Sequence, residues 1–138
     1  MRMECPFCEI LQIKKEGIIE ERKSVFVILS NPRLMPGHLL IIPKRHVFKL
    51  SELSAEEREE LFDTVIKFQE RIVSEFATGC DVRQNYRPFL KQGRLKVDHV
   101  HMHLLPRTFE DEYYQKCQIF EKDVFKELSE EEKKIFKK

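Results

Sequence analysis

The sequence is poor in several features that mark particular kinds of protein. Its 138 residues include no tryptophan, four glycines and six prolines, and they contain no internal repeat or low-complexity linker. No apolar run approaches the ~20 residues that cross a bilayer. The 25 basic and 24 acidic side chains almost cancel, leaving a net charge of +1, so no overall field attracts nucleic acid or a membrane surface. We therefore expect no membrane association and no stable nucleic-acid partner.

The length and the cysteines indicate one small domain in a reducing compartment. A chain of 138 residues favours a single domain over 1–138, with a core at about 5–107 and a charged C-terminal extension at 108–138. The first ten residues, MRMECPFCEI, lack the long apolar stretch and the cleavage site of a signal peptide. Four cysteines without such a signal favour a reducing environment. We expect a soluble, cytoplasmic protein.

One segment is typical of a long amphipathic helix. Ser54 is a suitable N-cap and Glu57 follows three residues later, which makes a capping box. Apolar residues then recur at helical spacing, and Gly79 can end the helix. These apolar residues are Leu61, Phe62, Val65, Phe68, Ile72, Val73 and Phe76. The pattern predicts a helix of roughly 22 residues.

Short apolar runs on either side of this helix are typical of strands. The predicted strands are 17–21, 24–29, 38–43, 80–86 and 95–105, the last ended by Pro106. Residues 9–15 predict a short helix ending at Gly17, and Ser129 with Glu132 can cap a short last helix. Strands grouped before and after one long helix indicate an α+β domain built on an antiparallel sheet.

Three of the five histidines alternate with apolar residues. His99, His101 and His103 fall on one face of the last predicted strand, with alternate residues ~6.8 Å apart. The residues on the opposite face can pack under the long helix; they are Val100, Met102 and Leu104. A neutral imidazole is nucleophilic at pH 7, and His-x-His on a strand is also a good zinc chelate. The alternation alone does not separate nucleophile from metal ligand.

The first cysteines form a Cys-x-x-Cys motif. Cys5 and Cys8 can supply half of a tetrahedral zinc site that histidines complete. A redox role requires this motif between a strand and a helix, and no strand precedes it. The spacing favours zinc, with unmetallated thiols and redox chemistry as the alternatives.

Two longer motifs resemble those of the histidine-triad (HIT) superfamily. HVHMHLL at 99–105 is similar to the alternating histidine motif, and PGHLLIIPKRH at 36–46 is similar to the strand and loop upstream of the long helix. The N-terminal Cys-x-x-Cys resembles the zinc-bearing branch. The likeness covers about 5–107. It implies a HIT-like α+β fold, with a five-stranded antiparallel sheet, one long helix and one short helix, and it implies a homodimer.

The same resemblance implies an enzyme, a nucleotide hydrolase or nucleotidyltransferase. His101 would attack the α-phosphorus of a nucleotide and form a nucleotidyl-histidine intermediate. His103 and His38 would bond phosphate oxygens or the leaving group. The implied substrates are dinucleoside polyphosphates, nucleoside phosphoramidates or adenylates. The alternatives are a nucleotide-binding module without catalysis and a zinc-dependent hydrolase in which the three histidines hold the metal.

The resemblance also implies a structural zinc ion. Its ligands would be Cys5, Cys8, His46 and His99, four protein groups that leave no open position. Holding His99 would fix the segment that aims the next histidine. The alternatives are that His46 is an ordinary loop histidine and that His38 only bonds a backbone carbonyl.

The chain departs from the family pattern at its substrate contacts. Lys96 occupies a place where serine or threonine is usual, within a basic loop at 87–96. Arg94 and Lys96 would grip a longer polyphosphate, or the loop is simply a solvated surface. Ser30 and Asn31 bracket the position at which relatives bind the ribose, which makes them candidate substrate contacts.

Overall fold

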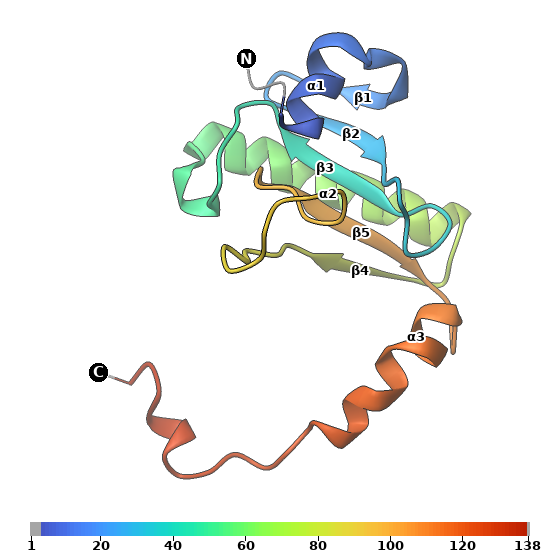
Figure 1. Cartoon of the computed structure of the whole chain (residues 1–138). Coiled ribbons are helices and arrows are strands. Elements are labelled where there is room, and N and C mark those ends of the chain that lie inside the picture. The colour runs from blue at the N-terminus through green and yellow to red at the C-terminus, as the bar shows by residue number, and fades with distance from the viewer. Residues whose placement is uncertain (1–3, 138) are drawn as a thin grey trace.

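A computed structural model describes residues 4–137, and Figure 1 shows the path of the chain. Five antiparallel strands form one sheet in the order β1-β2-β3-β5-β4. The strands are β1 (Ile18–Glu21), β2 (Val25–Leu29), β3 (Leu39–Pro43), β4 (Gly79–Arg83) and β5 (Met102–Arg107). The predicted α+β class and five-stranded antiparallel sheet are confirmed.

Three α-helices accompany the sheet. The predicted long and short helices are α2 (Ala55–Glu75) and α1 (Pro6–Ile13), and α3 (Glu112–Lys116) follows β5. Short 3₁₀ helices occupy Lys15–Gly17, Leu50–Glu52, Gln118–Asp123 and Glu132–Lys134. After α3 the chain runs away from the sheet in Figure 1. Within 4–137, no helix is long and apolar enough to cross a membrane.

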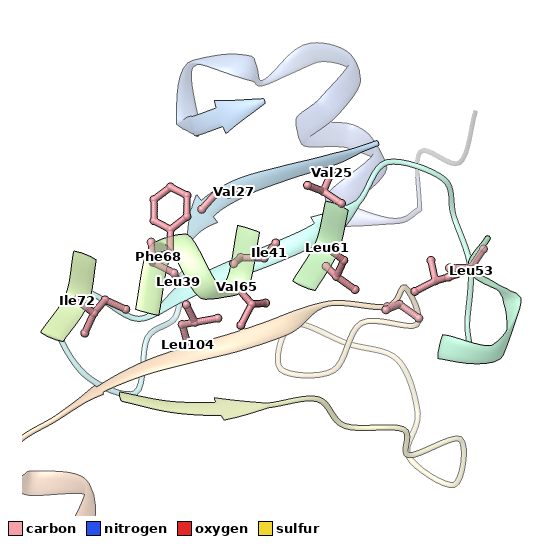
Figure 2. Close-up of a cluster of buried hydrophobic side chains, with 12 residues drawn as sticks. Val25, Val27, Leu39, Ile41, Leu53, Leu61, Val65, Phe68, Ile72 and Leu104 are labelled. Atoms are coloured by element: carbon pink, nitrogen blue, oxygen red, sulfur yellow. The ribbon is translucent and has the colours of Figure 1, made fainter. Parts of the chain in front are cut away.

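The two central strands β2 and β3 are apolar on both faces because each face is covered. Figure 2 shows side chains of α2 packed on one face of the sheet. The helix contributes Leu61, Val65, Phe68 and Ile72, and the sheet contributes Val25, Val27, Leu39, Ile41 and Leu104. On the opposite face, Phe7 of α1 packs with Phe26, Leu40 and Ile42. Each such buried side chain contributes about 1.5–3 kcal/mol, so these two layers fix the strands that carry the site.

The capping box of α2 ties the helix to the loop after β3. The backbone N–H of Glu57 donates to Ser54 Oγ at 3.1 Å, and the Ser54 N–H donates to Glu57 Oε1 at 2.8 Å. The same carboxylate accepts from Arg45 at 2.8 and 3.1 Å, which lowers the pKa of Glu57 to about 2. Arg45 precedes His46, so the start of the helix also holds the loop that carries this histidine.

Replacing Ser54 with alanine is expected to destabilise the protein. The substitution removes the acceptor for the Glu57 N–H, and lost N-caps cost about 1 kcal/mol. The midpoint of urea unfolding should fall while the slope stays constant. Ser51→Ala is the matched control, because Ser51 is exposed and makes no cap. Equal midpoints for the two variants would show that the cap does not stabilise the helix.

The strand predicted over 95–105 is wrong in extent. β5 begins only at Met102, because the backbone N–H of Val100 donates to the carbonyl of Val47 at 2.8 Å instead of joining the ladder. Pro106 does not end the strand either. The pairing with β3 stops at Leu104, so Pro106 has β4 as its only neighbour, and an edge position tolerates a missing N–H. The strand predicted over 80–86 is β4 and ends at Arg83.

Candidate active site and metal cluster

The three alternating histidines point away from the long helix. His99 and His101 lie in the irregular segment before β5, and His103 lies in the strand itself. The apolar residues between them pack in the α2 core, as predicted; they are Val100, Met102 and Leu104. The alternation therefore holds although the regular strand is shorter than predicted.

Two cysteines and two histidines meet at the N-terminal end of α1. Cys5 is the N-cap residue of α1 and Cys8 lies in its first turn. Cys5 Sγ lies 3.4 Å from His99 Nδ1, Cys8 Sγ lies 3.4 Å from His46 Nδ1, and the two Nδ1 atoms lie 3.1 Å apart. All four ligand atoms lie within 4.8 Å of one another. The structure thus brings together the four residues predicted to hold a metal.

These distances fit a tetrahedral ion. Bonds of ~2.3 Å to sulfur and ~2.0–2.1 Å to nitrogen place neighbouring ligand atoms ~3.3–3.8 Å apart. His99 Nε2 lies 2.7 Å from the carbonyl oxygen of Pro43, which can only accept, so this nitrogen carries the proton and Nδ1 offers its lone pair to the cluster. Burial lowers the pKa of His99 to about 4, which keeps the ring neutral as a metal ligand requires.

His101 is held in one tautomer by the backbone. Its Nδ1 lies 2.7 Å from the carbonyl oxygen of His99, so Nδ1 carries the proton and Nε2 keeps its lone pair. Phe7 packs against the ring edge-on, with centroids 4.9 Å apart. Burial lowers the pKa of His101. The side chain is therefore a neutral imidazole with an available Nε2, and it lines a cleft.

His38 and His103 form a directed pair beside His101. The N–H of Leu34 donates to His38 Nδ1 at 3.2 Å, so His38 carries its proton on Nε2 and donates it to His103 Nδ1 at 3.0 Å. The remaining proton of neutral His103 is then on Nε2. Burial, together with nearby positive charge, lowers the pKa of His38 to about 4 and that of His103 to about 3. The pair therefore presents one N–H donor, which is on His103. The ring centroids of His103 and His101 lie 4.8 Å apart.

Acidification is expected to destabilise the protein through this pair. His38 and His103 stay neutral in the folded state down to pH about 4 and about 3, whereas both ionise near ~6.5 in the unfolded chain. Below pH ~6.5 the unfolded chain binds more protons, so the free energy of unfolding falls with pH, by up to about 1.4 kcal/mol per pH unit for each ring. Urea unfolding at pH 7 and pH 5 measures the loss, which should be smaller in His38→Asn; an unchanged loss would contradict the assignment.

A cleft of about 1310 Å³ is lined by four of the five histidines, all except His46, and by all four predicted substrate-binding residues. Ser30 and Asn31 line it, and the Ser30 hydroxyl donates to the Pro32 carbonyl at 2.8 Å. Arg94 lies exposed in the basic loop, whereas Lys96 forms an ion pair with Asp98. The cleft exceeds the ~300–1,000 Å³ of common small-molecule sites, so it has room for more than a single nucleotide.

Arg83 and Arg87 belong to the basic residues seen in the sequence, but the sequence did not assign them to the site. The charges of Arg83 and Arg87 both reach His103 and help to lower its pKa, and both residues line the cleft. Arg83 stands opposite His103 in the pairing of β4 with β5. Nothing in the sequence sets this register, because the two strands are separated by an irregular loop. Only the assembled sheet shows that these arginines face the histidine pair.

The arrangement defines a small α+β protein with a neutral imidazole in an electropositive cleft. Residues 11–110 match the family model described as the HIT domain, and the chain belongs to this family. The resemblance inferred from the histidine and Cys-x-x-Cys motifs is confirmed.

Curated relatives and solved structures agree with this placement. The chain is 31% identical over 113 residues to an adenosine 5′-monophosphoramidase of Schizosaccharomyces pombe, which covers 79% of the chain and 78% of that protein. It is 35% identical over 81 residues to an asymmetrical bis(5′-nucleosyl)-tetraphosphatase of the same organism, of which it spans only 42%. A crystal structure of a HIT family member from Bacillus subtilis superposes with a TM-score of 0.67 at 26% identity, covering 91% of this chain and 97% of that one.

Proposed function

We propose that the protein is an enzyme that cleaves nucleotide substrates at the α-phosphorus, with His101 Nε2 as the nucleophile. The observation that carries the proposal is the hydrogen bond from His101 Nδ1 to the His99 carbonyl, because it leaves the Nε2 lone pair at the cleft. A bond forms between Nε2 and phosphorus while the bond to the leaving group breaks. Water or another acceptor then displaces the imidazole, which returns to its neutral form.

The other residues of the cleft orient the reacting groups. His103 donates a hydrogen bond through its Nε2–H to a phosphate oxygen or to the leaving group, and His38 fixes the tautomer that makes this donor available. Ser30 and Asn31 contact the nucleoside. Arg94 and Lys96, which belong to the basic loop at the cleft, attract the phosphates.

Cys5, Cys8, His46 and His99 hold one structural zinc ion. The tetrahedral spacing of the four ligand atoms supports this assignment. Bound zinc supplies a cross-link between the N-terminal segment and the segment that carries His101. A catalytic metal on all three alternating histidines is not favoured, because His101 and His103 lie outside the cluster and His101 bonds a backbone carbonyl instead.

The relatives support the substrate class. One is named for an adenosine 5′-monophosphoramidase activity and another for cleavage of bis(5′-nucleosyl) tetraphosphates. Both names describe action on a phosphate derivative of a nucleoside. We place this chain in the same substrate class.

The protein acts as a cytoplasmic homodimer in this proposal. α2 carries a second apolar stripe on its outer side, and Phe62 and Phe76 are 60% and 68% exposed there. A second copy would cover this stripe, which also includes Ile66 and Val73. None of the four cysteines, which all lie within residues 4–137, forms a disulfide, and this supports a reducing compartment.

The experiment that tests the proposed function compares two substrates. Purified protein is incubated with diadenosine tetraphosphate and, separately, with AMP phosphoramidate, and the products are separated by chromatography. Release of AMP from at least one of them is the expected result. Failure to cleave either would remove the support for catalysis and favour a nucleotide-binding module.

A further inference from the structure

Arg83 stands beside the histidine pair, and no acidic side chain among residues 4–137 forms an ion pair with it. It is the last residue of β4, and its Cα is paired with that of His103 on β5. It lines the same cleft as His38 and His103, and its charge contributes to the low pKa of both rings. The guanidinium therefore lies at the side of the cleft where His103 offers its N–H donor.

The charge of Arg83 is not compensated within the described part of the chain. Among residues 4–137 it forms no ion pair, and its Nε is buried without a hydrogen-bond partner. Its Nη1 donates at 3.0 Å to the hydroxyl of Tyr113, a neutral group. By contrast Arg107, on the same face of the sheet, is paired with both Asp81 and Asp111. An unsatisfied guanidinium at a cleft is a binding group for an anion.

The start of the C-terminal extension holds Arg83 in place. Asp111 caps α3 by accepting from the Tyr114 N–H at 2.9 Å, and its carboxylate binds Arg107 at 2.7 and 3.0 Å. The Arg107 guanidinium lies over the ring of Tyr113, 5.0 Å from its centroid. The Tyr113 hydroxyl is thereby fixed at the guanidinium of Arg83. A residue after the predicted core thus contacts a side chain that lines the cleft.

We propose that Arg83, positioned by Tyr113, binds a phosphate of the leaving group and so selects substrates with a polyphosphate leaving group over those with a neutral one. The inference rests on the proposed nucleotidyl transfer. In the proposed function, His103 donates a hydrogen bond to the phosphate that His101 attacks. The guanidinium beside His103 is therefore placed to bind the next phosphate of the substrate. Arginine binds phosphate through paired N–H donors, and Arg87 adds positive charge at the same place. The amine released from a phosphoramidate gives these groups nothing to bind.

The test measures kcat/KM for diadenosine tetraphosphate and for AMP phosphoramidate. Arg83→Gln is expected to lower the value for the tetraphosphate by about 10- to 100-fold, the range for lost hydrogen bonds to a charged group, with less than about 3-fold change for the phosphoramidate. Tyr113→Phe keeps the ring under Arg107 and should cause a smaller loss, mainly in KM for the tetraphosphate. Lys91→Gln removes the same charge from the exposed loop and should change neither value.

An equal loss on both substrates, no loss in Arg83→Gln, or the same loss in Lys91→Gln would overturn the proposal. A binding measurement distinguishes failure of this inference from failure of the proposed function. Titration of diadenosine tetraphosphate into His101→Ala, with and without Arg83→Gln, reports the role of Arg83 even when nothing is cleaved. A dissociation constant that rises by about 10-fold or more with Arg83→Gln supports the inference, and an unchanged one contradicts it.

Discussion

His101→Ala is expected to lower kcat/KM for diadenosine tetraphosphate and AMP phosphoramidate by more than about 10³-fold, the scale on which nucleophile loss is measured. The reason is that no other side chain near the reacting phosphate has the same geometry. His103 accepts from His38 through Nδ1, so its remaining nitrogen is a donor and not a nucleophile. His99 gives one ring nitrogen to the metal cluster and the other to the Pro43 carbonyl. Chromatography of the products measures the loss.

The fold and the metal content serve as controls for this variant. Metal analysis of His101→Ala should match wild type, because His101 is not among the four cluster residues, and urea unfolding should still show one cooperative transition. A variant that loses metal together with activity would assign His101 to the metal and support the zinc-dependent hydrolase. A variant as active as wild type would show that the nucleophile lies elsewhere.

Removal of the metal is expected to have the second largest effect, and to act on stability. Cys8→Ser takes one thiolate from the cluster, so zinc content should fall from one ion per chain toward zero. Ligand binding to the folded state alone stabilises by about 4 kcal/mol when free ligand is 1,000 times its dissociation constant. A loss of that size should lower the melting temperature by at least about 10 °C. Metal analysis and thermal unfolding, with and without a chelator, measure the two effects.

Cys117→Ser is the matched control for this second substitution. Cys117 is an exposed free thiol outside the cluster, so its variant should keep both zinc and melting temperature. Wild-type protein that contains no metal after growth in zinc would contradict the assignment. If the activity left after chelation is proportional to the fraction of protein that stays folded, the ion is structural. If the protein stays folded but loses its activity, the ion is catalytic.

The parts of the fold that could be predicted are those that depend on local sequence patterns. The capping box at Ser54 and the spacing of Leu61, Val65 and Phe68 predicted α2. The alternation of His101 and His103 with apolar residues predicted which face each side chain takes, although the strand itself was misjudged. These features depend on neighbours a few residues away, which the sequence shows directly.

The features that could not be predicted depend on contacts between distant segments. The start of β5 is set by the hydrogen bond from Val100 to Val47, in a loop that follows another strand. Arg83 becomes part of the site only through the register of β4 against β5. Tyr113 reaches it from beyond the last strand. The prediction that His46 and His99 belong to the metal cluster came from family resemblance, because the spacing of Cys5 and Cys8 shows only half of a cluster.

The contact between Cys5 and His99 spans 94 positions of the chain, and this has a consequence for synthesis on the ribosome. The first cysteine leaves the exit tunnel long before the histidine it must meet, whereas α2 is built from near neighbours and can form as soon as it emerges. Long-range pairing is the slow part of folding. The nascent chain therefore exposes its N-terminal cysteines until almost the whole domain has been translated, and assembly of the Cys/His cluster and completion of the cleft become one late event.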